Sequence, residues 1–422
     1  MNFIKKYKKS EFLRNILTLF FGTSIAQVIP LLISPILSRM YTPDQFGQLG
    51  VLMSVIGLFS IIATFQYESA IMLPKKDKDA FNILTLAVVI TIFISILSYV
   101  VTSIFNVEIA DLLNSPSFSD WVFIIPFFVL LSGLFNSLNI WASRQKKFKR
   151  LAIRQVAQTT VGALTKLVLG WLKYLNSGLI WGTLLGQVTS TGVLTFITVR
   201  EDKKLFKTIS FSRIKKNAIE YQDFPKYTMW QGFFDLVNAS GVIFIISSFY
   251  GLTVVGMYAF ILGILQKPTK MIGQVVSQVF YQNASEKIAN NQSIHKDTIR
   301  LVKNLALIGG VIFLPMLIFA PFIFSFVFGE KWYEAGVIAQ VISPLLFVKF
   351  VTAPLVNISI LMKKQKKLML IALGMNVVFP IILLTLALLK EGYLTALIIS
   401  TALVVIYYYF IIKWIINLSK KS

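Results

Sequence analysis

The sequence predicts an all-α polytopic membrane protein with twelve transmembrane helices, and three observations carry this prediction. Of the 422 residues, 56% are apolar, more than soluble globular proteins usually contain. The apolar residues gather in long runs. Every second segment between these runs is basic, and the basic segments hold most of the 41 Lys and Arg residues. Such alternation is the positive-inside rule, and it predicts that both termini lie in the cytoplasm.

Each apolar run is long enough to cross a bilayer, because about 20 helical residues span the hydrocarbon layer. Helices are expected throughout, since lipid cannot satisfy the polar groups of an open backbone. The predicted spans are 15–38, 47–66, 80–105, 121–142, 152–172, 178–199, 227–250, 255–281, 301–328, 336–361, 368–389 and 393–415. The basic segments between and beside them are residues 5–14, 75–78, 144–154, 200–226, 287–303, 363–367 and 413–421.

Short internal repeats predict that the chain contains two related halves. Residues 37–41 (LSRMY) align with residues 246–250 (ISSFY) at an offset of 209, and Gly47 aligns with Gly256 at the same offset. Six spans in each half give both halves the same orientation, which predicts two parallel six-helix lobes with a substrate path between them. We predict an N-terminal lobe over 1–199, a linker over 200–226 and a C-terminal lobe over 227–422.

The predicted linker is the longest loop on the basic side. It mixes lysines with apolar residues such as Phe206, Ile209, Phe211 and Ile214. This composition fits an amphipathic helix that lies on the inner leaflet. It fits a solvated basic linker equally well.

Composition also excludes several classes of function. A net charge of +23 would suggest a nucleic-acid partner in a soluble protein, but these cations flank membrane spans, where they set topology and contact lipid headgroups. Membrane lipids are therefore predicted as partners, and nucleic acid is not. The chain has no Cys and a single His, His295, in a basic loop. Without metal-ligand clusters or phosphate-binding glycine loops, the sequence predicts neither a cofactor nor an enzyme.

Charged residues inside the spans are the candidates for function. Lys267 and Lys270 lie near the middle of the eighth span, and Lys349 lies near the middle of the tenth. A central Lys costs roughly 2.5–3.5 kcal/mol to insert, so these three should face a wet cavity. Deep cations outnumber deep acids, which predicts an anionic ligand such as a phosphate or pyrophosphate.

Four further charges have two interpretations each. Lys166 in the fifth span and Arg39 at the end of the first either line the same cationic cavity or extend to the membrane interface. Asp235 in the seventh span either neutralises a lysine or binds the H+ or Na+ that couples transport to a gradient. Glu68 after the second span either joins this coupling or pairs with a lysine of the following loop.

Several local sequences resemble the O-antigen and capsular polysaccharide flippases of bacteria. This group belongs to the multidrug/oligosaccharidyl-lipid/polysaccharide (MOP) exporter superfamily. The resemblance runs in the same order over nearly the whole chain. Its segments are residues 22–27 (GTSIAQ), 35–47 (PILSRMYTPDQFG), 67–68 (YE), 70–76 (AIMLPKK), 224–227 (FPKY), 279–281 (VFY), 284–286 (ASE) and 328–332 (FGEKW).

The resemblance implies two six-helix lobes around a cationic central cavity. It also implies transport of an undecaprenyl-pyrophosphate-linked oligosaccharide across the bacterial cytoplasmic membrane by alternating access, with a polysaccharide polymerase as a further partner. Two alternatives remain at this point. A drug/cation antiporter of the same superfamily would need more deep acids than this chain has. A membrane polysaccharide polymerase or ligase would need a larger outer loop than the one near residues 106–120.

Overall fold

A computed structural model describes residues 11–106, 108, 119–175, 177–290, 292–362 and 364–420. Every regular element in these residues is a helix. Lys267 and Asp235 are described as positions in helices, but their side chains lie outside the description. The basic segment over residues 5–9 and the loop over residues 109–118 also lie outside it.

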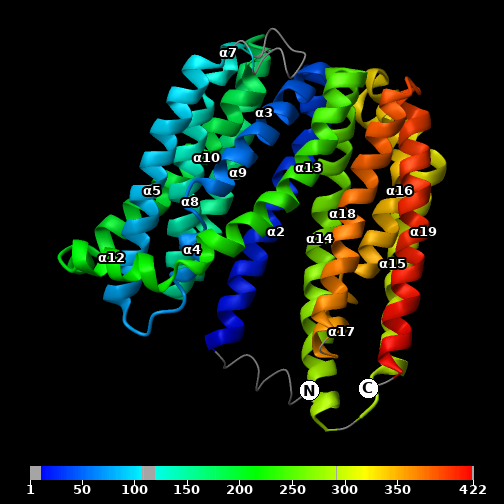
Figure 1. Ribbon diagram of the computed structural model, residues 1–422. Coiled ribbons are helices and arrows are strands. Elements are labelled where there is room, and N and C mark those ends of the chain that lie inside the picture. Colours follow the sequence, from blue (N-terminus) through cyan, green and yellow to red (C-terminus); the bar gives the residue numbers. More distant parts are fainter. Residues whose placement is uncertain are drawn as a thin grey trace. The chain divides into compact units, whose positions relative to one another are not determined.

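Each predicted span overlaps one long helix of the described chain, and some spans also include a short neighbouring helix (Figure 1). The long helices are α2 (Glu11–Met40), α3 (Pro43–Ile62), α5 (Asp77–Ile104), α8 (Ile125–Arg144), α9 (Phe148–Trp171), α10 (Gly178–Glu201), α13 (Met229–Tyr250), α14 (Leu252–Ala289), α15 (His295–Phe328), α16 (Tyr333–Thr352), α18 (Gln365–Leu388) and α19 (Tyr393–Ser419). Short elements join them: α4 (Tyr67–Ala70), α7 (Ser119–Val122), α11 (Lys203–Phe206), α12 (Phe211–Glu220), η2 (Phe224–Thr228), η3 (Glu330–Trp332) and α17 (Val356–Leu361).

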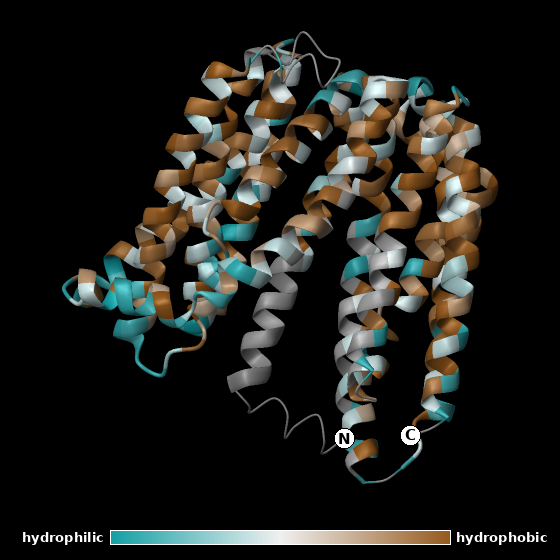
Figure 2. Cartoon of the chain, viewed as in Figure 1, coloured by the Kyte–Doolittle hydropathy of each residue, from teal (hydrophilic) through white to brown (hydrophobic). Residues whose placement is uncertain are grey.

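Seven helices of the described chain are both long and apolar enough to cross a membrane. An eighth results if residues Phe224–Phe234 and Ala239–Tyr250, which meet at a bend of 42°, form one span. The chain is therefore a multi-pass membrane protein, and the number of twelve crossings stays a prediction. Figure 2 shows the pattern that membranes require: apolar residues cover the middle of the helices, and hydrophilic residues gather at their ends.

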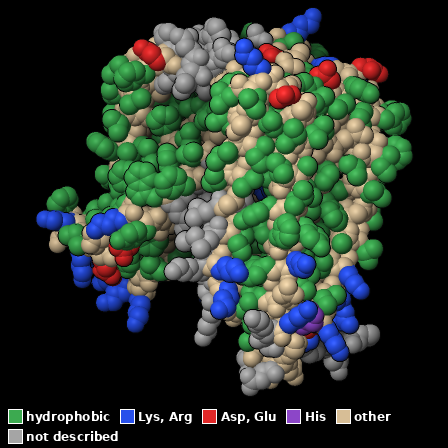
Figure 3. Space-filling view, turned by 45° about the vertical axis from the view of Figure 1, so that its right-hand side comes forward, with side chains coloured by type: hydrophobic (Ala, Val, Ile, Leu, Met, Phe, Trp, Pro, Cys, Tyr) green, Lys and Arg blue, Asp and Glu red, His purple; other side chains and the backbone are tan. Residues whose placement is uncertain are grey.

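The chain divides into two compact units. Unit 1 comprises Met1–Tyr41 and Gln48–Ile243, and unit 2 comprises Thr42–Gly47 and Phe244–Ser422. The division falls inside α13, whereas the predicted linker covers residues 200–226. The predicted lobe boundaries stay a prediction. In each unit, the basic loops gather at one end of the helices, here called the basic end (Figure 3).

The core of unit 1 lies where α5, α8 and α10 meet near the basic end. The rings of Phe81 and Trp141 form an edge-to-face pair with centroids 5.3 Å apart. The indole N–H of Trp141 donates to the carboxylate of Asp202 at 2.9 Å, so this buried polar atom is satisfied. Three cations at the junction of α8 and α9 are also paired: Arg144 contacts Asp77 at 3.0 Å, and Lys147 and Arg150 both contact Glu201.

Unit 2 has an aromatic core at the end opposite to its basic end. Phe260 of α14 packs against Trp332, with ring centroids 4.1 Å apart, and against Phe328 of α15 at 5.1 Å. Phe46 of α3 joins the cluster through an edge contact with Trp332 at 5.3 Å. Trp332 is fully buried. This cluster fixes the first turns of α14 against α15 and η3.

The repeat positions contact each other within unit 2. A Cβ atom on Gly47 would collide with the carbonyl oxygen of Leu252, and one on Gly256 would collide with that of Pro43. Asp44 and Thr253 are joined by a hydrogen bond of 3.0 Å. Asp44 and Thr253 are 209 positions apart, and so are Pro43 and Leu252, and Gly47 and Gly256, whose contacts run crosswise between the two pairs. A reciprocal contact of this kind is what two-fold-related repeats make, and it supports the predicted duplication.

Candidate functional site

Lys270 and Lys349 both belong to unit 2, on two helices, α14 and α16, that pack against each other. Lys270 is at the midpoint of α14, and Lys349 is in the last turn of α16. Both side chains are exposed rather than packed in the protein interior. The two ammonium groups are near enough to repel each other electrostatically. Within the described residues, neither lysine forms a hydrogen bond or an ion pair with a carboxylate. The sequence predicted both as cavity residues, and the structure brings them together.

A break in the tenth predicted span lies directly after Lys349. Helix α16 ends at Thr352, residues 353–355 form a turn, and α17 begins at Val356. Pro354 sits in this turn and has no backbone N–H to continue the helix. The sequence predicted one continuous span over 336–361, and this expectation was wrong in that detail. The break places Lys349 at a helix end, where membrane proteins commonly form polar sites.

A hydrogen bond between α17 and α14 lies on the same face of α14 as Lys270. The amide of Asn357 in α17 donates to the hydroxyl of Ser277 in α14 at 2.7 Å. Ser277 follows Lys270 by seven residues, or two helical turns, so the two positions share one face of α14. The same face of α14 therefore carries Lys270 and a hydrogen-bonding pair. A cation beside neutral donors can hold an anion and also the hydroxyl groups of a sugar.

Two candidates from the sequence lie outside the described side chains. Lys267 is one turn before Lys270 in α14. Asp235 is in α13, within unit 1. Their assignments to the cavity and to coupling remain predictions.

Arg39 and Lys166 belong to unit 1. Arg39 is exposed in the last turn of α2. Lys166 is half-buried, and its aliphatic stem lies against Gly182 of α10. Tyr41, two residues after Arg39, connects the two residues, because its hydroxyl donates to the carbonyl oxygen of Lys166 at 2.7 Å. The stem of Lys166 thus packs on a neighbouring helix, as snorkelling lysines do, while the direct role in substrate binding remains a prediction.

Glu68 is buried beside a tight turn. Phe65 and Gln66 adopt left-handed backbone conformations, with φ of 49° and 61°, and the chain then enters α4. The hydroxyl of Thr64 donates to the Glu68 carboxylate. The sequence offered an ion pair with a following lysine as one interpretation, but no such pair occurs in the described chain. Burial raises the pKa of Glu68, and the hydrogen bond from Thr64 offsets part of this rise.

Sequence reasoning missed one cation, Arg154. It lies in the basic segment 144–154 and also at the start of the predicted span 152–172, and the structure places it in the second turn of α9. Its guanidinium donates to Asn139 at 3.0 Å and to Gln158 at 3.4 Å, and it covers the ring of Phe135 at 4.6 Å. The spacing of four residues between Arg154 and Gln158 is the signal that could have identified this pair.

The polar cluster around Arg154 extends to the next helix. Gln158 donates to the side chain of Gln187 in α10 at 3.0 Å. The Nε atom of Arg154 is buried and has no hydrogen-bond partner among the described residues. The helices approach closely here, since a Cβ atom on Gly186 would lie 2.9 Å from the carbonyl oxygen of Gln158. Arg154 is thus one member of a packed polar network inside unit 1.

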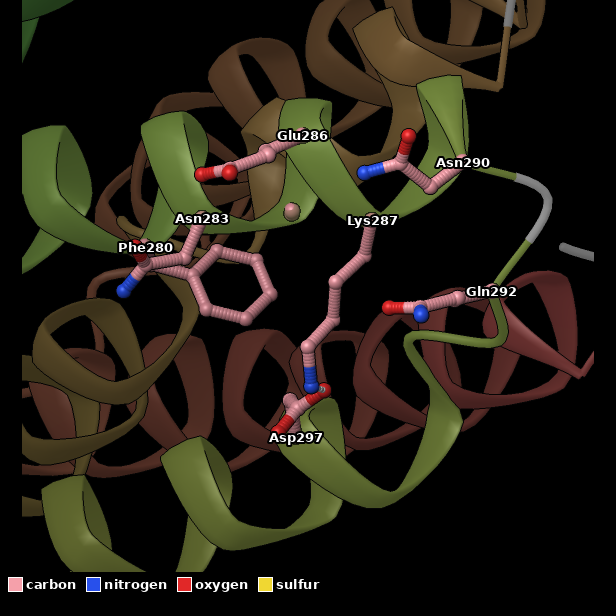
Figure 4. A pocket seen from close by; sticks show the side chains of 8 residues that line it. Phe280, Asn283, Glu286, Lys287, Asn290, Gln292 and Asp297 are labelled. Carbon is pink, nitrogen blue, oxygen red and sulfur yellow. Dashed lines mark hydrogen bonds and ion pairs between the residues drawn. The ribbon is translucent and has the colours of Figure 1, made fainter.

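A pocket of about 360 Å³ lies at the basic end of unit 2. Figure 4 shows Lys287 reaching from α14 to Asp297 on α15, and the two groups form an ion pair of 2.6 Å. Glu286 also lines the pocket. With its lysine neutralised and a second acid present, the pocket has no preference for an anion. No group of His, Cys, Asp or Glu in the described residues is arranged to hold a metal ion.

Comparison with known proteins places the chain in a family. A family model described as "Polysaccharide biosynthesis protein" matches residues 36–337. The chain therefore belongs to the polysaccharide biosynthesis protein family. A search of curated proteins finds no match.

Solved structures show which fold this family member has. An inward-facing multidrug resistance MATE family transporter of the MOP superfamily matches with a TM-score of 0.67 and 12% identity, over 94% of this chain and 95% of that chain. The lipid II flippase MurJ in its inward closed conformation matches with a TM-score of 0.72 and 14% identity, over 94% and 87%. The chain thus has the MOP exporter fold, as the sequence predicted, and these two neighbours are a transporter and a flippase.

Proposed function

We propose that this protein is a flippase for a lipid-linked oligosaccharide. It moves an undecaprenyl-pyrophosphate-linked repeat unit, of O-antigen or capsule, from the inner to the outer leaflet of the bacterial cytoplasmic membrane by alternating access. The observation that carries the proposal is the Lys270–Lys349 pair, two like charges on packed helices that have no carboxylate partner among the described side chains. Membership of a polysaccharide biosynthesis family and a fold shared with a lipid II flippase support it.

The chemistry of the proposed substrate matches this pair. A polyprenyl tail is already soluble in the bilayer, so only the headgroup is costly to transfer. Its pyrophosphate carries the negative charge, and its sugars carry hydroxyl groups that lose water on leaving the interface. Lys270 and Lys349 supply point charges for the phosphates. Asn357 and Ser277, on the same face of α14 as Lys270, offer neutral hydrogen-bonding groups for the sugar.

The empty site and the loaded site differ in electrostatic energy. Without substrate, the two ammonium groups repel each other. A bound pyrophosphate replaces this repulsion by two attractions. Only a conformation that holds both lysines near the substrate gains this binding energy. A ligand shifts a transporter toward one conformation only when it binds that conformation more tightly than the other. Loading of the headgroup would therefore favour the conformation in which α14 and α16 are closest.

Coupling and partners complete the proposal. Asp235 either binds the H+ or Na+ that resets the transporter or balances a lysine of the cavity, and Glu68, buried and with a raised pKa, is the second candidate for a proton. Lys267, Lys166 and Arg39 extend the cationic path. Both termini face the cytoplasm, and a polysaccharide polymerase receives the product on the outer side.

A drug/cation antiporter is the alternative within the same fold. Its substrate is positively charged and would be repelled by the exposed lysine pair, so the described charges disfavour it. Transport of a cationic drug by the purified protein, without transport of the lipid-linked sugar, would reverse this preference.

Reconstitution tests the proposal directly. Purified protein is placed in vesicles containing a fluorescent undecaprenyl-pyrophosphate-linked oligosaccharide, and the sugar that becomes accessible to an added lectin is followed over time. We expect transport by the wild type, loss in Lys270→Ala, and partial activity in Lys270→Arg, which keeps the charge. Lys303→Ala, which removes an exposed lysine at the basic end of unit 2, serves as the matched control. Wild-type vesicles that never expose the sugar would refute the function.

A further inference from the structure

Helices α11 and α12 form a basic ledge beside α5 in unit 1 (Figure 1). We define the ledge as residues 203–220. It contains six Lys and Arg residues and one acid, Glu220. Figure 3 shows basic and hydrophobic side chains together on the part of unit 1 that projects at its basic end. The sequence left open whether this segment is an ordered amphipathic helix or a solvated linker.

Specific hydrogen bonds fix one face of the ledge to α5. Fully buried Asn82 donates to the carbonyl oxygen of Thr208 at 3.1 Å and accepts from the backbone N–H of Ser210 at 3.0 Å. Asn217 donates to the carbonyl oxygen of Asp79 at 3.1 Å. These bonds anchor the start and the second turn of α12. The ledge is therefore an ordered element whose rotation about its own axis is set.

The opposite face of α12 remains uncovered and combines apolar and basic residues. Phe211 is 81% exposed and Ile219 is 60% exposed. Lys215 lies between them at a spacing of four residues, and Lys216 is its exposed neighbour. Apolar side chains flanked by lysines on one helical face are the pattern of helices that bind anionic membrane surfaces.

The position of the ledge along the axis of α5 indicates which part of the membrane the exposed face of α12 meets. Asn82, which holds the ledge, precedes Val89 by seven residues, and Val89 is the first strongly exposed large apolar residue of α5. Seven helical residues rise about 10 Å. The headgroup layer begins where the lipid-facing apolar surface ends, and it is several ångströms thick. Amphipathic helices bury their apolar face by about 5–10 Å at this level. The ledge thus lies at the depth of the headgroups.

We infer that the ledge over residues 203–220 binds the anionic phospholipid headgroups of the membrane in which the protein resides. Phe211 and Ile219 enter the interface, and the lysines contact lipid phosphates. A soluble acidic protein would account for the charges but not for the position of the ledge at the edge of the lipid-facing surface. The inference is independent of the transported substrate.

The absence of native cysteine makes a site-specific test possible. Ile219→Cys is labelled with an environment-sensitive fluorophore, and the full-length protein is placed in nanodiscs of phosphatidylcholine with increasing phosphatidylglycerol. We expect a blue shift and quenching by brominated lipid that grow with the anionic fraction and weaken at high salt, because salt screens the lysines. A label that stays water-exposed at every lipid composition would overturn the inference.

Charge variants separate lipid binding from a general effect of the label. In Lys215→Gln/Lys216→Gln, the phosphatidylglycerol fraction needed for half of the shift should rise, with affinity falling about fivefold per lysine, the factor that ~1 kcal/mol represents. Lys296→Gln/Lys303→Gln, which removes two exposed lysines at the basic end of unit 2, should leave the titration unchanged. Equal effects of the two double variants would contradict the inference. A response of the label to soluble polyphosphate that anionic nanodiscs do not reproduce would also contradict it.

Discussion

Lys270 and Lys349 in unit 2 and Arg154 in unit 1 are cations on membrane helices in opposite surroundings. Arg154 has an amide oxygen on either side and an aromatic ring beneath it. The two lysines are exposed, and the charge that acts on Lys349 among the described side chains is that of Lys270. A cation with fixed polar partners, such as Arg154, contributes to the stability of the fold. The two lysines have no such partner among the described side chains, and we propose that the substrate supplies it.

The difference teaches how to interpret deep charges in this fold. Position in the sequence does not separate the two cases, since each residue lies within or beside an apolar run. The partners of the side chain separate them. The comparison predicts that loss of a lysine damages transport and spares stability, whereas loss of Arg154 damages stability first.

The largest effect is expected from charge reversal at the lysine pair. Lys349→Glu places an acid beside Lys270 and would form an internal ion pair that competes with the substrate. A charge-assisted hydrogen bond contributes about 1.5–3 kcal/mol, so transport should fall at least roughly tenfold to a hundredfold. The measurement is the rate of sugar exposure per folded protein in vesicles. A rate equal to that of the wild type would remove the pair from the substrate path.

Arg154→Ala should have the largest effect on stability. It leaves Asn139 and the Gln158–Gln187 pair with unsatisfied groups, which costs about 1–3 kcal/mol. Thermal unfolding in detergent should shift to lower temperature, and Arg154→Lys should recover part of the loss. Transport per folded molecule should fall less than in Lys270→Ala. Unchanged stability with abolished transport would show that Arg154 acts like the lysine pair, and the comparison would fail.

Lys349→Gln should stabilise the unloaded protein, because it removes the repulsion from Lys270. The gain is expected to be at most about 1 kcal/mol, the usual size of a single interaction between two charged side chains. Pyrophosphate should raise the unfolding temperature of the wild type, because a ligand stabilises the state that binds it. The same concentration should raise that of the variant less. An equal response of the two proteins would place the pyrophosphate elsewhere.

Glu68→Gln should change stability least among these variants. It extends the comparison from cations to a buried acid. Because burial raises the pKa of Glu68 in the folded protein, its contribution to stability is present below the unfolded pKa and is lost as pH rises through the folded pKa. Wild-type stability should therefore decline with pH in this window relative to the Gln variant. Unfolding temperatures of both proteins across pH 4 to 8 provide the measurement. Parallel curves would show that Glu68 does not titrate in this range.

The sequence by itself determined the helical membrane fold, because lipid imposes its requirements locally. An apolar run of sufficient length must be a helix, and alternating basic loops orient it. The repeat positions Gly47 and Gly256 were also readable from the sequence, and the structure places them in contact. Lys270 and Lys349 could be selected as costly charges without knowledge of their neighbours.

Only the tertiary structure decided which of these charges have partners. Lys270 and Lys349 are 79 positions apart, and their proximity depends on how α14 packs against α16. The break at Pro354, the network around Arg154 and the docking of residues 203–220 on Asn82 likewise depend on contacts between helices. Hydropathy depends on each residue and its near neighbours in the chain. Pairing depends on side chains distant in sequence, and for that reason a single sequence specifies the spans more directly than the site.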